Sequence, residues 1–115
     1  MSLKIEQRDS AGVTVVELIG RLTLGEASAQ LRDALKGLVD SGKKNIVLHL
    51  GEVGYIDSSG LGELVAGFTT VKNQGGVLKL AHLTQKVNDL LTITKLYTVF
   101  EIHDDEAGAV KSFEG

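Results

Sequence analysis

The sequence predicts an α/β fold with a mixed β-sheet and about four α-helices. Two β-branched segments separated by a short turn open the chain, and segments with helical and strand-like apolar spacing alternate after them. A helix between two strands forms a right-handed crossover, so the central strands should be parallel. The 115 residues match the size of one domain, and we expect residues 1–115 to share a single core.

The first two segments predict an antiparallel hairpin. Residues 13–19 are rich in β-branched side chains and lie between Gly12 and Gly20, which favours a strand. Residues 5–8 have a weaker strand pattern, and Ala11-Gly12 supplies the turn between the two segments.

A helix and a central strand are expected next. Apolar residues recur with helical spacing over residues 27–38, and Gly42 suits a left-handed cap at the end of this helix. Residues 45–50 alternate in hydrophobicity, which is typical of a strand. A short connection is expected over residues 51–55.

The second half of the chain continues the alternation. Apolar side chains over residues 61–71 mark one face of a second helix, which should end before Gly75-Gly76. The remaining elements are predicted as a strand at 77–81, a helix at 84–91, a short edge strand at 99–102 and a helix at 105–113.

Composition and charge argue against several classes of function. The chain has 12 basic and 15 acidic residues, and its largest basic cluster is Lys43-Lys44, so we expect no direct binding to nucleic acid or to a membrane. Cysteine is absent, and His49, His82 and His103 lack the short spacing of metal ligands. The start does not resemble a signal peptide and no apolar run approaches about 18 residues, so the expected location is cytoplasmic.

Residues 54–62 carry the clearest functional signal, because they join the central strand to the start of the second helix. A helix start has unpaired N–H groups and a partial positive charge, and it can therefore hold a phosphate. Ser58 lies at this position beside Asp57. Phosphorylation would add about 1.5 to 2 negative charges, which should change the surface potential and leave the fold intact.

Small residues are expected on the outward face of the second helix, away from its apolar stripe, at Gly62, Ala66, Gly67 and Thr70. A glycine inside a helix costs about 1 kcal/mol relative to alanine, and close approach of a partner protein would compensate for that cost. The structural alternative is that Ser58 or Ser59 only caps the helix and that the glycines permit tight packing within the fold.

Three enzyme motifs fail in this sequence. The run from Gly60 to Val65 begins like a dinucleotide-binding fingerprint but has valine in place of the third glycine. Neither Ser58 nor Ser59 follows a glycine by two residues, as a nucleophile elbow requires, and no Gly-Lys-Ser or Gly-Lys-Thr sequence is present. We therefore expect a regulatory binding protein with no catalytic residue, metal or cofactor, and not an enzyme.

Four parts of the sequence together resemble the STAS domain family, and within it the bacterial anti-sigma factor antagonists. They are Gly20-Arg21-Leu22, Asn45-Ile46-Val47-Leu48-His49-Leu50, Tyr55-Ile56-Asp57-Ser58-Ser59-Gly60-Leu61-Gly62 and Gly75-Gly76-Val77-Leu78. The resemblance covers nearly the whole chain and implies a STAS-like fold. It implies that Ser58 is the phosphoacceptor and that Asp57, Ser59 and Gly60 support the loop. Partner binding is expected at Leu22, Thr23, Leu24, Gly25, Glu26, Gly62, Glu63, Ala66 and Gly67.

The resemblance also implies a cycle of partner switching. The unphosphorylated protein would bind an anti-sigma factor that is also a serine kinase with the histidine-kinase-like ATPase fold, and a sigma factor would be released. Phosphorylation of Ser58 would end this binding, and a serine phosphatase would restore it. The alternative is a non-switching STAS scaffold subunit, permanently docked in a stressosome-like sensory complex or in a transporter-associated complex.

Overall fold

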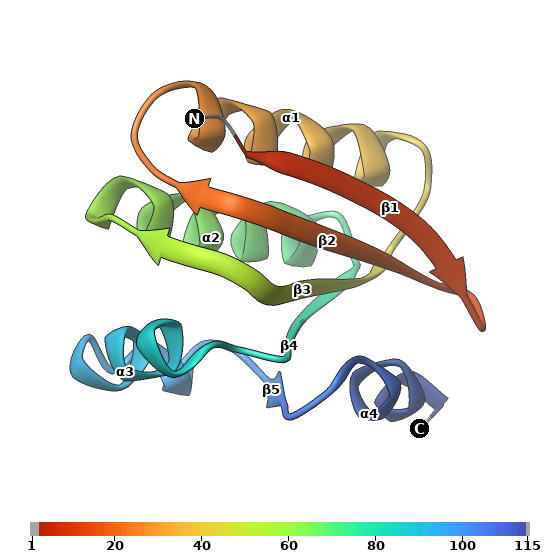
Figure 1. The fold of residues 1–115 in the computed structure, drawn as a ribbon. Helices are drawn as coiled ribbons and strands as arrows, with labels where there is room; N and C mark the ends of the chain where they lie inside the picture. The colour runs from red at the N-terminus through yellow and green to blue at the C-terminus, as the bar shows by residue number, and fades with distance from the viewer. Residues whose placement is uncertain (1–2, 115) are drawn as a thin grey trace.

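The computed structural model describes residues 3–114, which form a five-stranded β-sheet with the strands in chain order (Figure 1). The strands are β1 (Lys4–Ser10), β2 (Val13–Leu22), β3 (Asn45–Ile56), β4 (Val77–Ala81) and β5 (Ile102–His103). β1 and β2 are antiparallel, and each of the other neighbouring pairs is parallel. The predicted mixed sheet is therefore confirmed.

Four α-helices are present in this part of the chain, in agreement with the sequence. They are α1 (Glu26–Asp40), α2 (Ser58–Asn73), α3 (Gln85–Ile93) and α4 (Glu106–Lys111), with 3-10 turns at Leu96–Thr98 and Ser112–Glu114. Gly42 has φ +86° and ends α1 with the predicted left-handed cap. The N–H groups of Gly42 and Lys43 donate to the carbonyls of Val39 and Leu38, which are the bonds of a Schellman motif.

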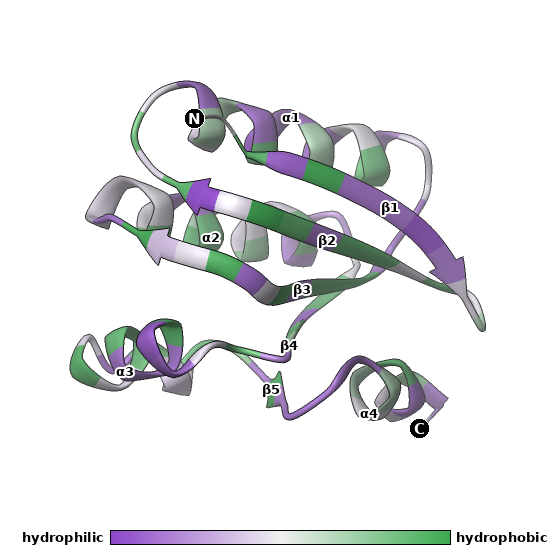
Figure 2. Cartoon of the chain, viewed as in Figure 1, coloured by the Kyte–Doolittle hydropathy of each residue, from purple (hydrophilic) through white to green (hydrophobic). Residues whose placement is uncertain are grey.

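The sheet is covered on both faces at its centre. α1, α2 and α3 contribute to the larger core, in which Leu64 and Leu91 are fully buried. A smaller core on the other face packs Ala109 of α4 with Val15 and Val47. The edge strand β1 is largely hydrophilic, whereas β2 and β3 carry long hydrophobic stretches (Figure 2). The centre of β3 is thus apolar on both sides, as expected for an internal parallel strand.

β3 is longer than the sequence predicts. Residues 51–55 are not a connection but the second half of this strand, which stays beside β2 as far as the pair Leu22↔Ile56. Glycine is typical of loops, which is why this segment was predicted as a connection. Gly51 instead lies within the sheet, at a position that leaves no room for a side chain. A Cβ atom at Gly51 would lie 2.9 Å from the His49 ring. The longer strand brings the ends of β2 and β3 together at one edge of the sheet.

The edge strand predicted at residues 99–102 is also corrected. β5 contains only Ile102 and His103, because the chain before it forms a 3-10 turn and then sends Phe100 into the core. The Phe100 ring meets Phe68 edge-on, with centroids 5.5 Å apart. Burial of this side chain replaces extended pairing along β4.

Three further observations concern the described residues. Across residues 3–114, every helix is too short or too polar to cross a membrane. His49 and His82 lie side by side, with ring centroids 4.9 Å apart, although the sequence separates them widely. No group of three or more histidine, cysteine, aspartate or glutamate side chains in the described part of the chain could hold a metal ion.

Candidate functional site

The loop after β2 and the start of α2 meet at one end of the sheet (Figure 1). β2 and β3 are parallel and finish together, so residues 23–25 and 57–60 leave the sheet side by side. The Asp57 N–H donates to the carbonyl oxygen of Leu22 at 3.3 Å and joins the two segments. The predicted phosphorylation loop and the predicted partner-binding loop therefore form a continuous surface.

Ser58 is the first residue of α2, and its side chain is exposed. The helix does not use it as a cap, because Asp57 is the N-cap residue and its Oδ1 accepts the Gly60 N–H at 2.8 Å. Among the hydrogen bonds of residues 3–114, none involves the Ser58 hydroxyl. The alternative in which Ser58 or Ser59 caps the helix is therefore wrong. The Ser58 hydroxyl is accessible at the positive end of a helix.

The Asp57 carboxylate ties the helix to the neighbouring loop. While Oδ1 accepts the Gly60 N–H, Oδ2 accepts the Leu24 N–H at 2.9 Å. These hydrogen bonds, first from Gly60 and then from Leu24, hold the pKa of Asp57 below its ordinary value because they stabilise the charged form. The carboxylate is thus a fixed negative charge that bridges two segments far apart in sequence.

Gly60 is needed where α2 begins against the end of β2. It is buried, and a Cβ atom at this position would lie 2.1 Å from the Leu22 carbonyl oxygen. Backbone atoms cannot move aside as a flexible side chain can, so only glycine fits. Ser59, the next residue after Ser58, is half-buried beside it.

The loop from β2 to α1 presents an apolar side chain to solvent. Leu24 is 76% exposed, and Gly25 and Glu26 are exposed beside it at the start of α1. Thr23 is half-buried, and its carbonyl accepts hydrogen bonds from both the N–H and the hydroxyl of Ser28.

Leu22 was predicted to bind a partner, but its position in the fold does not allow this role. Its side chain is fully buried in the larger core. It is the last residue of β2, where the inward alternation of that strand continues. Leu22 therefore contributes a backbone carbonyl to the site, and its side chain is not available to a partner.

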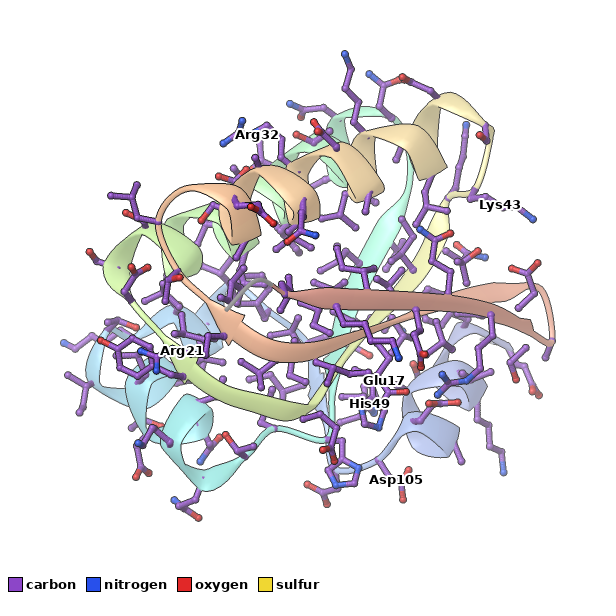
Figure 3. All side chains as sticks on the ribbon, turned by 45° about the horizontal axis from the view of Figure 1, so that its top comes forward. Glu17, Arg21, Arg32, Lys43, His49 and Asp105 are labelled. Atoms are coloured by element: carbon purple, nitrogen blue, oxygen red, sulfur yellow. The ribbon has the colours of Figure 1, made fainter. Side chains whose placement is uncertain are left out.

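The predicted outward face of α2 is open at only part of its length. Gly62, Ala66 and Thr70 are exposed, and a Cβ atom at Gly62 would meet nothing within 4 Å. The Glu63 carboxylate accepts two hydrogen bonds from Arg32 of α1, at 3.0 and 3.2 Å. Figure 3 shows Arg32 on the outer side of α1. Glu63 is therefore held by a neighbouring helix at the margin of the exposed face.

Gly67 does not lie on this outward face, and its prediction as a partner-binding residue is wrong. It is buried between α2 and α1, and a Cβ atom there would lie 2.4 Å from Cδ1 of Leu35. The packing alternative therefore holds for Gly67. It does not hold for Gly62.

Two side chains at this end of the molecule had no predicted role. The Arg21 guanidinium lies over the ring of Tyr55, 4.8 Å from its centroid, and Tyr55 is 40% exposed. Figure 3 shows Arg21 at the end of β2, near the start of α2. No local pattern predicted this contact, because residues 51–55 resembled a connection, whereas the strand places Tyr55 opposite Arg21.

The chain is similar to proteins of one family along nearly its full length. The family model described as STAS domain matches residues 3–109. The anti-sigma-B factor antagonist of Bacillus subtilis (strain 168) is 32% identical over 111 residues, covering 96% of this chain and 100% of the relative. The crystal structure of an anti-sigma factor antagonist from Mycobacterium paratuberculosis has a TM-score of 0.83 at 20% identity, covering 98% of this chain and 95% of the other. The phosphorylated form of the Bacillus cell fate determinant SpoIIAA has a TM-score of 0.73 at 18% identity, covering 96% and 98%.

Proposed function

The chain belongs to the STAS domain family, and within this family we propose that it is an anti-sigma factor antagonist switched by phosphorylation of Ser58. The observation that carries the proposal is the exposed Ser58 hydroxyl at the start of α2, with the capping role taken by Asp57. The name of the B. subtilis relative and the phosphorylated form of SpoIIAA support it.

In the proposed cycle, the unphosphorylated protein binds an anti-sigma factor that is also a serine kinase with the histidine-kinase-like ATPase fold. Binding releases a sigma factor from the kinase. The kinase then transfers the γ-phosphoryl group of ATP to Ser58 Oγ, so that the bond to the ADP oxygen breaks, a new P–O bond forms and a base of the kinase takes the hydroxyl proton. A serine phosphatase hydrolyses the ester and restores the first state.

The surroundings of Ser58 explain why a phosphate would prevent binding. The N–H groups of Gly60 and Leu24 already donate to the Asp57 carboxylate. A phosphate on Ser58 adds about 1.5 to 2 negative charges next to that carboxylate and is left facing solvent. Docking a partner on this surface would then require removal of water from the phosphate beside the Asp57 carboxylate, which is costly.

The proposal is tested by incubating the protein with ATP and a serine kinase of this fold encoded beside its gene. Mass spectrometry should find one phosphate, on Ser58, and none in Ser58→Ala. The matched control Ser59→Ala should still be phosphorylated at Ser58. Absence of phosphate, or phosphate at another residue only, contradicts the proposal.

Binding provides the second measurement. Ser58→Asp should weaken kinase binding by about tenfold or more, since charge is added at the contact surface. Its melting temperature should stay within a few degrees of the wild-type value, because the side chain is exposed and is not the cap. If size-exclusion chromatography instead shows a stable complex whose size changes neither with ATP nor with this substitution, the protein is a permanent scaffold subunit.

A further inference from the structure

A shallow groove of about 240 Å³ lies between the end of β3 and α3, next to the proposed phosphorylation site. Its walls are apolar and include Tyr55, Ile56, Leu90 and Ile93, with Lys86 and Asp89 at the rim. In Figure 1, α3 lies at the same end of the molecule as the loop after β2 and the first turn of α2. The groove therefore extends the candidate surface from α2 onto α3.

The distribution of exposed apolar side chains also marks this end. Ile93 is 78% exposed and Leu24 is 76% exposed, the two largest values among the large apolar side chains of residues 3–114. Leu24 is joined to the site by its hydrogen bond to Asp57, and Ile93 by the groove that it shares with Tyr55. Two segments next to the candidate site, the loop with Leu24 and the helix with Ile93, thus each present an exposed apolar side chain.

The kinase must bring ATP to the Ser58 hydroxyl, so it covers the surface around that oxygen. A stable interface covers about 800 Å² on each partner, which corresponds to a circular patch with a radius of roughly 16 Å. Tyr55 precedes Ser58 by three residues and lies at most about 10 Å from it along the chain. We infer that the kinase that phosphorylates Ser58 also docks in the groove between Tyr55 and α3, which rests on the function proposed above.

The charges around the groove indicate which side chains of the kinase it accepts. Arg21 and Lys86 form no ion pair within residues 3–114, although the whole chain has a net charge of −3. Asp89 is engaged by the side-chain amide of Gln85 at 2.7 Å. Lys86 and Asp89 carry the charges of the groove lining, and the Arg21 guanidinium over the Tyr55 ring adds a positive charge beside it. The groove fits an apolar side chain of the kinase against Ile93 and Tyr55, with an acidic side chain beside Lys86.

The test compares Ile93→Glu with Val77→Glu as substrates of the kinase that phosphorylates the wild-type protein. Val77 is also exposed, at 45%, but it pairs with Asn45 at the opposite end of β3 from Ser58. Ile93→Glu should raise KM for phosphorylation of Ser58 by about tenfold and leave kcat within about twofold, since it removes apolar burial and the reacting groups are unchanged. Val77→Glu should keep the wild-type KM.

Two more variants separate the apolar contact from the charge. Ile93→Ser introduces no charge and should raise KM by roughly fivefold, in a way that salt does not change. Lys86→Glu should raise KM mainly at low ionic strength, because screening weakens an exposed charge pair. Circular dichroism should give wild-type spectra for all four variants, since each site is exposed.

Each outcome decides the inference. Wild-type KM in Ile93→Glu would show that the kinase does not cover the groove, and the phosphorylation switch itself would stand. A loss of kcat with unchanged KM would overturn the docking role in the same way. If sedimentation reveals a wild-type dimer that Ile93→Glu dissociates, the groove binds a second copy and the inference is wrong. If the wild-type protein receives no phosphate at Ser58, the proposed function and this inference fail together.

Discussion

The glycines of α2 separate two regions of one helix, a packed side and an open side. Gly60 and Gly67 lie where α2 meets β2 and α1, and a Cβ atom at either position would collide with a neighbour. Gly62 faces solvent and would meet nothing within 4 Å. Packing accounts for the first two residues and leaves Gly62 without a structural role in the fold. The difference separates the part of the helix that supports the site from the part that is free to contact a partner.

Gly60→Ala should have the largest effect on stability. The added methyl group would meet the backbone carbonyl of Leu22, which cannot rotate away. We expect a loss of about 3 kcal/mol in the free energy of unfolding, or a fall of about 12 °C in melting temperature. Thermal unfolding followed by circular dichroism measures it. A fall of less than about 4 °C would mean that the end of β2 yields easily, and the packed side would then be less rigid than proposed.

Asp57→Ala tests the bridge that joins the packed side to the loop. The substitution removes the N-cap of α2 and the acceptor for the Leu24 N–H. The melting temperature should fall by about 6 °C, within the range known for loss of a cap. The amide of Leu24 should also exchange with deuterium faster than in the wild-type protein. Unchanged exchange at Leu24 would contradict the role of Asp57 in holding the loop.

The charge of Asp57 predicts a pH dependence with a definite sign. Its pKa in the folded protein is lowered, chiefly by the hydrogen bond from Gly60, so the folded state binds this proton less readily than the unfolded state. The stabilisation is therefore complete above the unfolded pKa of about 4 and is lost as the pH falls through the lower folded pKa. Asp57→Asn retains a capping acceptor without the charge. The difference in melting temperature between wild type and Asp57→Asn should be constant above about pH 5 and should shrink as the pH falls below about 4.

Gly67→Ala should be milder than Gly60→Ala, because its methyl group would meet Cδ1 of Leu35, the end of a flexible side chain. Overpacking costs about 2 kcal/mol and the helix gains about 1 kcal/mol from alanine, so a net loss of about 1 kcal/mol or 4 °C is expected. The loss should disappear in a Leu35→Ala background, which provides room. An equal loss in both backgrounds would show that Leu35 is not the obstacle.

Gly67 also shows why part of the fold could not be predicted from the sequence. Apolar spacing predicted α2, and Gly75, at φ +82°, follows its end as expected, because helical period and glycine conformation are local properties. The side of α2 that faces α1 depends on how two helices pack, which spacing within one helix does not contain. The alternation of β2 predicts the inward direction of Leu22, but this strand was expected to end before Gly20.

The candidate site also has features that local sequence signals predict and features that depend on how the elements pack. The start of α2 at Ser58 and the place of Asp57 beside it follow from local signals, and both are found where the sequence suggested. The hydrogen bond from the Leu24 N–H to Asp57 could not be predicted, because it depends on the register that places the last residues of β2 and β3 side by side. The groove that contains Ile93 depends on the same unpredicted extension of β3 to Ile56.

Gly62→Ala should have the smallest effect and the opposite sign. No atom opposes the added methyl group, so the helix should gain about 0.8 to 1 kcal/mol, a rise of about 3 to 4 °C. If a partner backbone approaches this position closely, the same methyl group should weaken kinase binding by several fold. A more stable protein that binds less well would thus identify Gly62 as a contact residue. Ala66→Gly is the matched control, since it should lower stability by about 1 kcal/mol at another exposed position of the helix. Increased stability with unchanged affinity in Gly62→Ala would instead place this turn of α2 outside the interface.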